Sequence, residues 1–483
     1  MVNSYKMYIN GVWTDAASGA YYDDFSPYTG EMFARVADGG AADAKKAIDA
    51  AAAAFPDWKR FSPNEKRKML FNAADIIDKR IDEFAHVLAV ETGAATPFAR
   101  FQAFTGPEFL REAASQVFEV SGQIFPSQNP DTISMMWRQP AGVVASISPW
   151  NAAMLLALRG ISFPLAYGNT VVHKTSEASS VAGGVLLAEV FEEAGFPAGV
   201  LNVVTNGPGK SSEIGDVLTT DERVRRITFT GSTEAGVYLA VQSARNMKKI
   251  CLELGGSCPL IILDDADIDY AVDAAAFGRF MHQGQVCMNS KRLIVEKGIA
   301  AEFIDKLTKK AKTLKCGNPL EHDTIIGPLV NKSQIDRLIA QVGHAVEQGA
   351  RLTCGGSYEG LVYHPTVLVL TEEMDLAQEE AFGPVACVFV AEDAEDALRI
   401  ANSTKYGLSG GIISKDTLKA WDLAERLDAG VTHINGSSLG DETRAPLGGV
   451  KFSGWGKNGF LAIDEFTEAR WVTLNKKPLH FPF

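Results

Sequence analysis

From residue 142 onward the chain alternates short apolar runs with helical segments, and this alternation constrains the fold more than any other feature. Each run is four or five residues long and rich in valine and isoleucine, which favour strands. Strands that alternate with helices are typical of βαβ units on a parallel sheet. The first series of predicted strands comprises residues 143–147, 170–173, 200–204 and 226–229.

A second series of the same kind follows residue 287, with predicted strands at 292–295, 385–390 and 411–414. A chain of 483 residues is longer than one hydrophobic core normally supports. We therefore expect an α/β protein with two domains, each built on a largely parallel sheet.

Two other regions lie outside these series. Residues 41–117 read as packing helices, with one helix that stops at Pro56 and a longer amphipathic run from 63 to 91. Residues 132–137 and 470–474 alternate polar and apolar side chains with period two. Such segments could be edge strands within one subunit, or they could pair with another chain.

Composition narrows the class of protein. The net charge of −13 argues against a nucleic-acid partner. Six widely spaced cysteines fit neither a zinc site nor a disulfide framework, and the eight histidines show no metal spacing, so we expect no metal and a reducing, cytoplasmic setting. No apolar run reaches the length of about 18 residues that crosses a bilayer, and the start lacks a secretory pattern, so we expect no membrane partner.

Two glycine-rich segments carry the clearest chemistry. Glu253-Leu254-Gly255-Gly256 offers a carboxylate, and Gly284-Gln285-Val286-Cys287 offers a thiol. A thiolate attacks carbonyl carbons, and a carboxylate can deprotonate the thiol or the water that later cleaves an acyl-enzyme. The pair therefore indicates an enzyme that passes through a thioester, although a lone Cys is also a common core residue and a lone Glu a common surface charge.

Three further segments follow predicted strands. Gly231-Ser232-Thr233-Glu234-Ala235-Gly236 opens a helix whose free amides could hold a pyrophosphate, or it is an ordinary capped turn. Lys174-Thr175-Ser176-Glu177 is either a ribose site, in which Glu177 would repel a 2′-phosphate, or a helix start. Asn151, in Ser148-Pro149-Trp150-Asn151, could stabilise an oxyanion or could cap a helix.

Taken together and in this order, these motifs resemble the aldehyde dehydrogenase superfamily over nearly the whole chain. The resemblance implies that Cys287 is the nucleophile, that Glu253 is the general base, and that Asn151 and the Cys287 amide form the oxyanion hole. It further implies a dinucleotide site, with NAD as the expected cofactor and NADP possible, at the following residues: Trp150, Lys174, Glu177, Gly231, Ser232, Glu380 and Phe382.

The resemblance also divides the chain. It implies a Rossmann-like dinucleotide-binding domain, the NAD-binding domain, at residues 1–120 and 141–253 and a second α/β domain, the catalytic domain, at 254–452. The remaining residues, 121–140 and 453–483, resemble a small β oligomerisation arm, which implies a homodimer or homotetramer.

Within the superfamily the chain looks most like the aromatic-aldehyde branch, the salicylaldehyde, benzaldehyde and vanillin dehydrogenases. The signs include Gly284-Gln285-Val286-Cys287-Met288, Ala445-Pro446-Leu447-Gly448-Gly449 and the ending Pro482-Phe483. Arg159 falls where this branch places a pocket residue, although a helix arginine is more often a surface salt-bridge partner, and Val286 and Met288 flank the thiol.

The chain departs from the usual pattern at Thr175, at Ser257 and at Asn289-Ser290-Lys291, the last where Ser-Thr-Glu is typical of the branch. The expected activity is oxidation of an aldehyde, most simply an aromatic one, to the carboxylic acid through a thiohemiacetal and a thioester. Aliphatic or semialdehyde oxidation, a coenzyme-A-acylating reaction, a cofactor-independent cysteine hydrolase or acyltransferase, and a non-catalytic binding protein are the alternatives.

Overall fold

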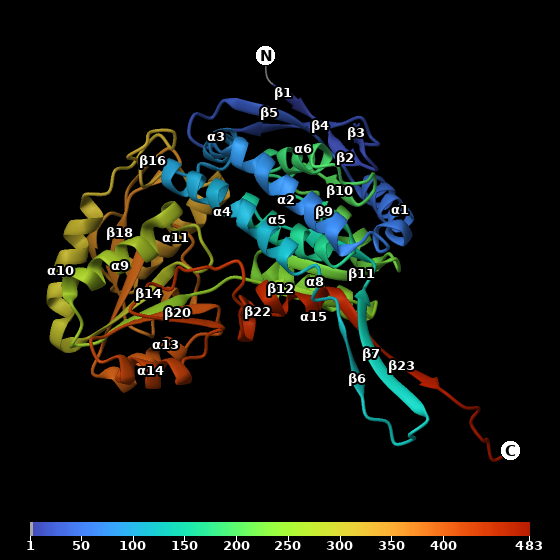
Figure 1. Cartoon of the computed structure of the whole chain (residues 1–483). Helices are drawn as coiled ribbons and strands as arrows, with labels where there is room; N and C mark the ends of the chain where they lie inside the picture. The colour runs from blue at the N-terminus through green and yellow to red at the C-terminus, as the bar shows by residue number, and fades with distance from the viewer. Residues whose placement is uncertain (1–2) are drawn as a thin grey trace.

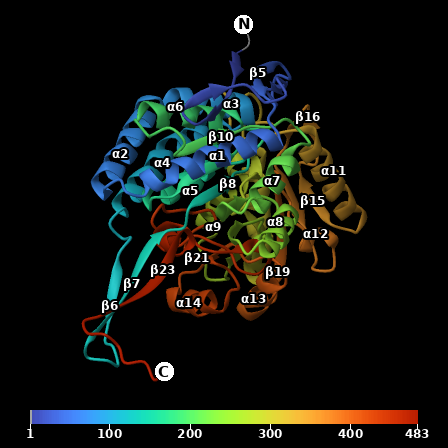
Figure 2. The ribbon, with the colours of Figure 1, turned by 90° about the vertical axis from the view of Figure 1, so that its right-hand side faces the viewer.

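Two parallel sheets form the centres of two lobes, and a narrow three-stranded sheet projects from the first lobe (Figure 1). This computed structural model describes residues 3–483. Figure 2 shows the same arm, which carries the C-terminus away from the lobes. The α/β architecture expected from the alternating pattern is confirmed.

The first sheet has eight strands in the order β22-β12-β11-β8-β9-β10-β2-β3. Its five central strands are parallel. β22 and β2 pair antiparallel with the two ends of this group, and β3 pairs antiparallel with β2. The strand order reverses between β8 and β11, which is where open α/β sheets bind ligands. The strands are β2 (Met7–Ile9), β3 (Val12–Thr14), β8 (Val143–Ile147), β9 (Thr170–Lys174), β10 (Leu201–Val204), β11 (Val224–Thr230), β12 (Lys249–Glu253) and β22 (Gly454–Trp455).

Helices cover both faces of this sheet. The predicted helical region contains four helices, and the first does not stop at Pro56 as predicted but continues to Trp58. Trp58 is buried and packs on Phe61 and Phe196, so the burial of the last turn outweighs the hydrogen bond that proline removes. The helices are α1 (Ala41–Trp58), α2 (Pro63–Lys79), α3 (Ile81–Thr92), α4 (Thr96–Ser115), α5 (Ala153–Ala166), the π-helical turn η1 (Val181–Val185), α6 (Leu186–Glu193), α7 (Ser211–Thr220) and α8 (Thr233–Arg245).

The second sheet has seven strands in the order β15-β18-β19-β14-β13-β20-β21, all parallel except β15. Its strands are β13 (Cys258–Ile262), β14 (Ser290–Glu296), β15 (Arg351–Cys354), β18 (Thr366–Val369), β19 (Val385–Ala391), β20 (Ser409–Ile413) and β21 (Val431–Ile434). Its helices are α9 (Ile268–Phe280), the 3₁₀ turn η2 (Met281–Gly284), α10 (Lys297–Lys312), α11 (Lys332–Glu347), α12 (Asp375–Gln378), α13 (Ala394–Asn402) and α14 (Thr417–Arg426).

The two predicted period-two segments pair with each other. β23 (Thr467–Asn475) runs antiparallel to β7 (Thr132–Pro140) along its whole length, and β6 (Gly122–Phe125) pairs with the other edge of β7. The three strands therefore form one arm within the chain, and pairing between subunits stays a prediction. Short elements complete the fold: β1 (Asn3–Tyr5), β4 (Tyr21–Phe25), β5 (Met32–Ala37), β16 (Tyr358–Glu359), β17 (Val362–Tyr363), η3 (Lys451–Ser453), η4 (Gly459–Leu461) and α15 (Ala462–Phe466).

The domain boundaries stay a proposal. We propose a dinucleotide-binding lobe at 1–120 and 141–253, a catalytic lobe at 254–452 and an arm at 121–140 and 453–483. One strand crosses this division, because Gly454–Trp455 pairs with β12 in the first sheet although it falls in the arm by sequence. Within residues 3–483, no helix is long and apolar enough to cross a membrane.

Candidate active site

Cys287, Glu253 and Asn151 meet where the two lobes face each other. Glu253 ends β12 of the first sheet, Asn151 follows β8 of the same sheet, and Cys287 lies between η2 and β14 of the second lobe. All three side chains line both a largely apolar cavity of about 460 Å³ and a groove on its other side. The three predicted catalytic residues are thus brought together at one junction.

The turn that carries Cys287 is held by an unusual backbone. His282 and Gln283 have positive φ angles of 53° and 52°, and Gly284 follows with φ of 71°. A β-carbon at Gly284 would collide with the Gly383 carbonyl, so only glycine fits there. Asn289 closes the turn, since its side chain accepts a hydrogen bond from the Val286 amide at 2.7 Å and donates one to the Gly278 carbonyl at 2.8 Å.

The thiol itself is protonated in this environment. Burial raises the pKa of Cys287 to about 12, and the neighbouring Lys291 ammonium opposes that rise. A nucleophilic attack by sulfur at neutral pH therefore requires a group that takes the proton away. Burial likewise raises the pKa of Cys258, whose thiol donates to the Cys287 carbonyl, to about 11.

Two donors lie beside the thiol. The Asn151 side-chain amide donates one hydrogen to the Gln285 carbonyl at 2.9 Å, which leaves its second hydrogen free of that bond. The Cys287 backbone amide makes no hydrogen bond to any residue from 3 to 483. A side-chain amide and a free backbone N–H are the donors that an oxyanion requires.

Glu253 is held by two side chains from different parts of the chain. Arg159 on α5 donates to Glu253 Oε2 at 2.9 Å, and Asn458 donates to Oε1. Arg159 also pairs with Asp441, and its guanidinium lies 5.1 Å from the centre of the Phe109 ring. Burial alone would lower the pKa of Arg159, but the two carboxylates outweigh it and raise that pKa, so the side chain is cationic.

Arg159 is therefore buried in the site, with 6% of its side chain exposed, and is not a surface salt-bridge partner. The predicted pocket residues Val286 and Met288 are also buried and line the same cavity. Most of the remaining wall is apolar and comes from α4, α5, α9 and the loop before β22. Its large apolar side chains are Phe98, Phe101, Leu155, Leu156, Leu254, Phe277, Met281, Leu408, Leu439 and Leu447.

The groove on the other side of Cys287 begins at the strand-order reversal. Gly231 and Ser232 follow β11, Trp150 follows β8, and all three line the groove. Ser232 caps α8, with its hydroxyl accepting from the Ala235 amide at 3.3 Å. Phe382 lies edge-on to Trp150, with ring centres 5.7 Å apart. A helix amino end at this place presents free amides to an anion.

Lys174 and Glu177 line the continuation of this groove, a cavity of about 380 Å³. Lys174 ends β9, and its ammonium donates to the Ser211 hydroxyl at 2.9 Å. Burial lowers the pKa of Lys174 to about 8, and Glu177 opposes that change. A cation, a carboxylate and hydroxyls around one cavity suit a ribose with its hydroxyl groups, so the donor set fits a dinucleotide.

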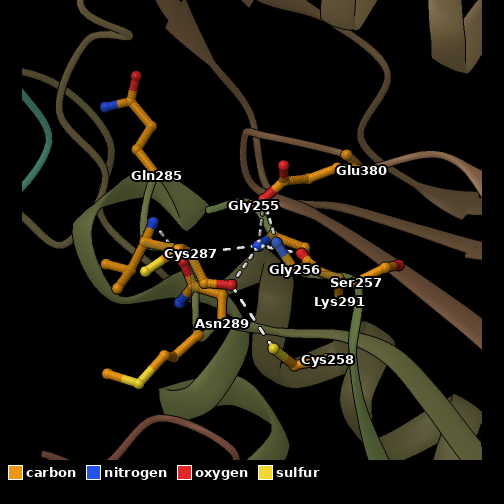
Figure 3. A network of polar contacts seen from close by, with 12 residues as sticks. Gly255, Gly256, Ser257, Cys258, Gln285, Cys287, Asn289, Lys291 and Glu380 are labelled. Atoms are coloured by element: carbon orange, nitrogen blue, oxygen red, sulfur yellow. Dashed lines mark hydrogen bonds and ion pairs between the residues drawn. The ribbon is translucent and has the colours of Figure 1, made fainter. Parts of the chain in front are cut away.

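Glu380 is joined to the backbone of Cys287 through Lys291 (Figure 3). Its Oε1 accepts from Lys291 Nζ at 2.8 Å and from the Gly256 amide at 3.3 Å. Every residue predicted for the dinucleotide site lines the groove or its continuation: Trp150, Lys174, Glu177, Gly231, Ser232, Glu380 and Phe382.

Two residues of the site were not found from the sequence. Asn458 lies in a glycine-rich loop whose spacing gives no sign of contact with Glu253, and Asp441 has no motif around it. Both reach the site only through long-range folding. In residues 3–483 no cluster of histidine, cysteine or carboxylate side chains is arranged to hold a metal ion.

A thiol beside a carboxylate and free amide donors, with a groove on one side that fits a dinucleotide, is the arrangement expected of a thiol-dependent oxidoreductase. Comparison with known proteins agrees, because the model of the aldehyde dehydrogenase family matches residues 13–472. The chain belongs to the aldehyde dehydrogenase family.

Its relatives include a vanillin dehydrogenase of Pseudomonas fluorescens, 44% identical over 98% of both chains. A benzaldehyde dehydrogenase [NAD(+)] of Pseudomonas putida is 35% identical over 98% of this chain and 96% of its own. Among solved structures, a salicylaldehyde dehydrogenase from Pseudomonas putida G7, complexed with salicylaldehyde, is 40% identical, covers both chains completely and superposes with a TM-score of 0.97.

Proposed function

We propose that this enzyme oxidises aromatic aldehydes to carboxylic acids, with Cys287, Glu253 and Asn151 as its catalytic residues. The observation that carries the proposal is the position of Cys287 at the junction of the two cavities. An apolar cavity of about 460 Å³ suits one aromatic ring, and the groove suits a dinucleotide. The relatives named for vanillin, salicylaldehyde and benzaldehyde support the substrate class.

The reaction begins when the Cys287 sulfur adds to the aldehyde carbon and its proton leaves to Glu253, directly or through water. The carbonyl oxygen takes up negative charge, and the Asn151 amide and the Cys287 N–H stabilise it. One aligned donor of this kind is worth roughly 3 kcal/mol in a transition state. A dinucleotide held in the groove by residues that include Trp150, Glu380 and Phe382 would supply the acceptor for the hydride that leaves the resulting thiohemiacetal carbon.

Loss of hydride leaves a thioester on Cys287. Glu253, after passing the thiol proton to solvent, takes a proton from a water molecule while the water oxygen attacks the thioester carbon. The C–S bond then breaks, and the leaving sulfur takes that proton back from Glu253. The carboxylate product leaves and the thiol is restored. Arg159 and Asn458 hold the two oxygens of Glu253, so they keep its carboxylate beside the thiol during both steps.

For the cofactor we propose NAD in preference to NADP. Glu177 lines the cavity that suits a ribose, where a 2′-phosphate would meet a carboxylate of like charge. Lys174 offers one compensating cation, which is why NADP is expected to be the weaker cofactor and not an inert one.

We also propose that the arm pairs with a second copy of the chain. All four residues of β6 are exposed at the edge of the arm sheet, and Ile124 on it is 78% exposed. An open edge with exposed apolar side chains is a site for strand pairing.

All six cysteines are free thiols, which supports a reducing, cytoplasmic compartment.

The test is to follow formation of reduced nicotinamide by absorbance with NAD or NADP and a panel of aldehydes. The panel contains benzaldehyde, salicylaldehyde, vanillin, hexanal and succinic semialdehyde, and Cys287→Ala is the control. We expect turnover with the aromatic members and none with the control. Faster turnover of the aliphatic members would reject the substrate class, and dinucleotide-independent hydrolysis of an aryl ester would favour the hydrolase alternative.

A further inference from the structure

Lys291 is one of the positions at which the sequence departs from its branch, and the proposed mechanism does not use it. Its side chain is 1% exposed, so a full positive charge is buried in the site. Charged lysines are almost never buried without partners. Its partners therefore indicate why the charge is there.

Four oxygen atoms surround the Lys291 ammonium (Figure 3). Nζ lies 2.7 Å from the carbonyl oxygens of both Gly256 and Cys287 and 3.1 Å from that of Val286. The fourth oxygen is Glu380 Oε1 at 2.8 Å. Lys291 thus joins three segments: the nucleophile turn, the glycine turn after Glu253, and the loop that carries Glu380.

The hydrogen bond from Lys291 determines which carboxylate oxygen of Glu380 stays free. Oε1 is shared by Lys291 and the Gly256 amide, whereas Oε2 makes no hydrogen bond to any residue from 3 to 483. Glu380 lines the groove beside Cys287 together with Trp150. A carboxylate with one oxygen fixed and the other free can accept a hydrogen bond from a ligand hydroxyl without first reorganising.

The contact with the nucleophile turn brings the cation to the backbone of the residue that carries the thiol. Lys291 is the nearby charge that most opposes the rise of the Cys287 pKa caused by burial. It also binds the Cys287 carbonyl, so the same ammonium orients the residue and favours its thiolate.

We propose that Lys291 is a positioning residue that acts through two neighbours, holding Glu380 for a ribose diol of the dinucleotide and holding Cys287 for attack. The first half rests on the proposed dinucleotide site. The second half concerns the thiol alone and can be measured without any cofactor.

The test uses the full-length enzyme and the variants Lys291→Met, Glu380→Gln and their double mutant. The first readout is the dissociation constant of NAD without aldehyde, measured by calorimetry. We expect Lys291→Met to raise it roughly tenfold, as the loss of one charged hydrogen bond does. If Lys291 acts through Glu380, the double mutant binds no more weakly than the weaker single mutant, whereas additive effects would overturn the proposal.

The second readout is the rate at which Cys287 of the empty enzyme reacts with iodoacetamide, followed by peptide mass spectrometry. Removal of a nearby cation raises a thiol pKa by about one unit or more. A thiolate with a higher pKa is also more nucleophilic, which offsets part of the loss of thiolate. At a pH below the thiol pKa, each unit by which that pKa rises therefore slows alkylation about three- to fourfold. Cys316, which lies outside the network, is the internal control and keeps its rate.

Lys297→Met, a change at an exposed lysine six positions away, is the matched control and leaves both readouts unchanged. Lys291→Gln keeps donors and removes the charge, so it serves if Lys291→Met does not fold, and it slows alkylation with a smaller effect on NAD binding. Unchanged binding and alkylation in a folded variant would refute the role of Lys291. Failure of the wild type to bind NAD would instead refute the dinucleotide site.

Discussion

Arg159→Met is expected to destabilise the protein strongly, because it removes the cation that the buried Glu253 and the partly buried Asp441 share. The guanidinium donates to Glu253 at 2.9 Å and to Asp441, and the exposed fractions of the two acidic side chains are 7% and 17%. Removing one partner of a buried ion pair costs about 3–5 kcal/mol, since the remaining charge is left uncompensated. Methionine retains most of the volume, so the loss reports charge and not a cavity.

The assay is equilibrium urea unfolding at neutral pH, with Arg100→Met as the control. Arg100 makes a 2.7 Å ion pair with Asp82, but 44% of its side chain is exposed, so the control loses less than about 1 kcal/mol. Adding Asp441→Leu to Arg159→Met removes one stranded charge and should recover part of the stability. Equal losses in Arg159→Met and Arg100→Met would refute the reasoning.

Three other outcomes follow from the structure. Glu177→Ser should raise kcat/KM for NADP roughly tenfold relative to NAD, because it removes a like charge from the neighbourhood of the 2′-phosphate. An unchanged ratio would show that the ribose does not bind beside Glu177. Lys174, with its pKa lowered to about 8, is cationic below that pH and neutral above it. NAD dissociation constants should therefore rise about fivefold from pH 7 to pH 9, with a flat profile in Lys174→Met; a wild-type profile as flat as the variant's would contradict this role. Gly454→Ala should lower thermal stability by more than about 3 kcal/mol, because φ is 110° and a β-carbon would collide with the Leu252 carbonyl. Gly19 also has a positive φ, but open space surrounds the position of its β-carbon, so Gly19→Ala should lower the stability by only about 1 kcal/mol. Equal losses in the two variants would show that the structure relieves the collision at Gly454.

Much of the fold could be predicted from the sequence because its central strands are short and apolar. The strands β8 to β11 of the first sheet and β14, β19 and β20 of the second fall on the predicted series, since buried parallel strands read as continuous apolar runs. Four other parallel strands were not predicted: β12, β13, β18 and β21. The separate small sheet β1-β5-β4 was not predicted, because its strands contain exposed polar residues, and neither was the edge strand β22, which has only two residues. The extension of α1 past Pro56 depends on the burial of Trp58, which no local pattern reveals.

The residues of the site also fall into a group that local sequence motifs predict and a group that they do not. Cys287, Glu253 and Asn151 stand in glycine-rich or strand-end motifs that can be read locally, and the structure brings them to one junction. The contacts that hold them are not local, since Lys291 and Glu380 are 89 positions apart and Asn458 and Glu253 are 205 apart. Those partners become visible only when the two lobes are placed together.

The central claim is that the substrate becomes covalently bound to Cys287 and that Glu253 releases it. The most direct test is to mix Glu253→Gln with NAD and benzaldehyde, quench with acid, and map the adduct by peptide mass spectrometry. We predict a benzoyl group on the peptide that contains Cys287, formed together with about one equivalent of reduced nicotinamide per site. It should form more slowly than in the wild type, because the thiol proton then leaves to solvent hydroxide, and it should persist because the base for hydrolysis is missing. Reduced nicotinamide without an acyl group on Cys287 would contradict the account.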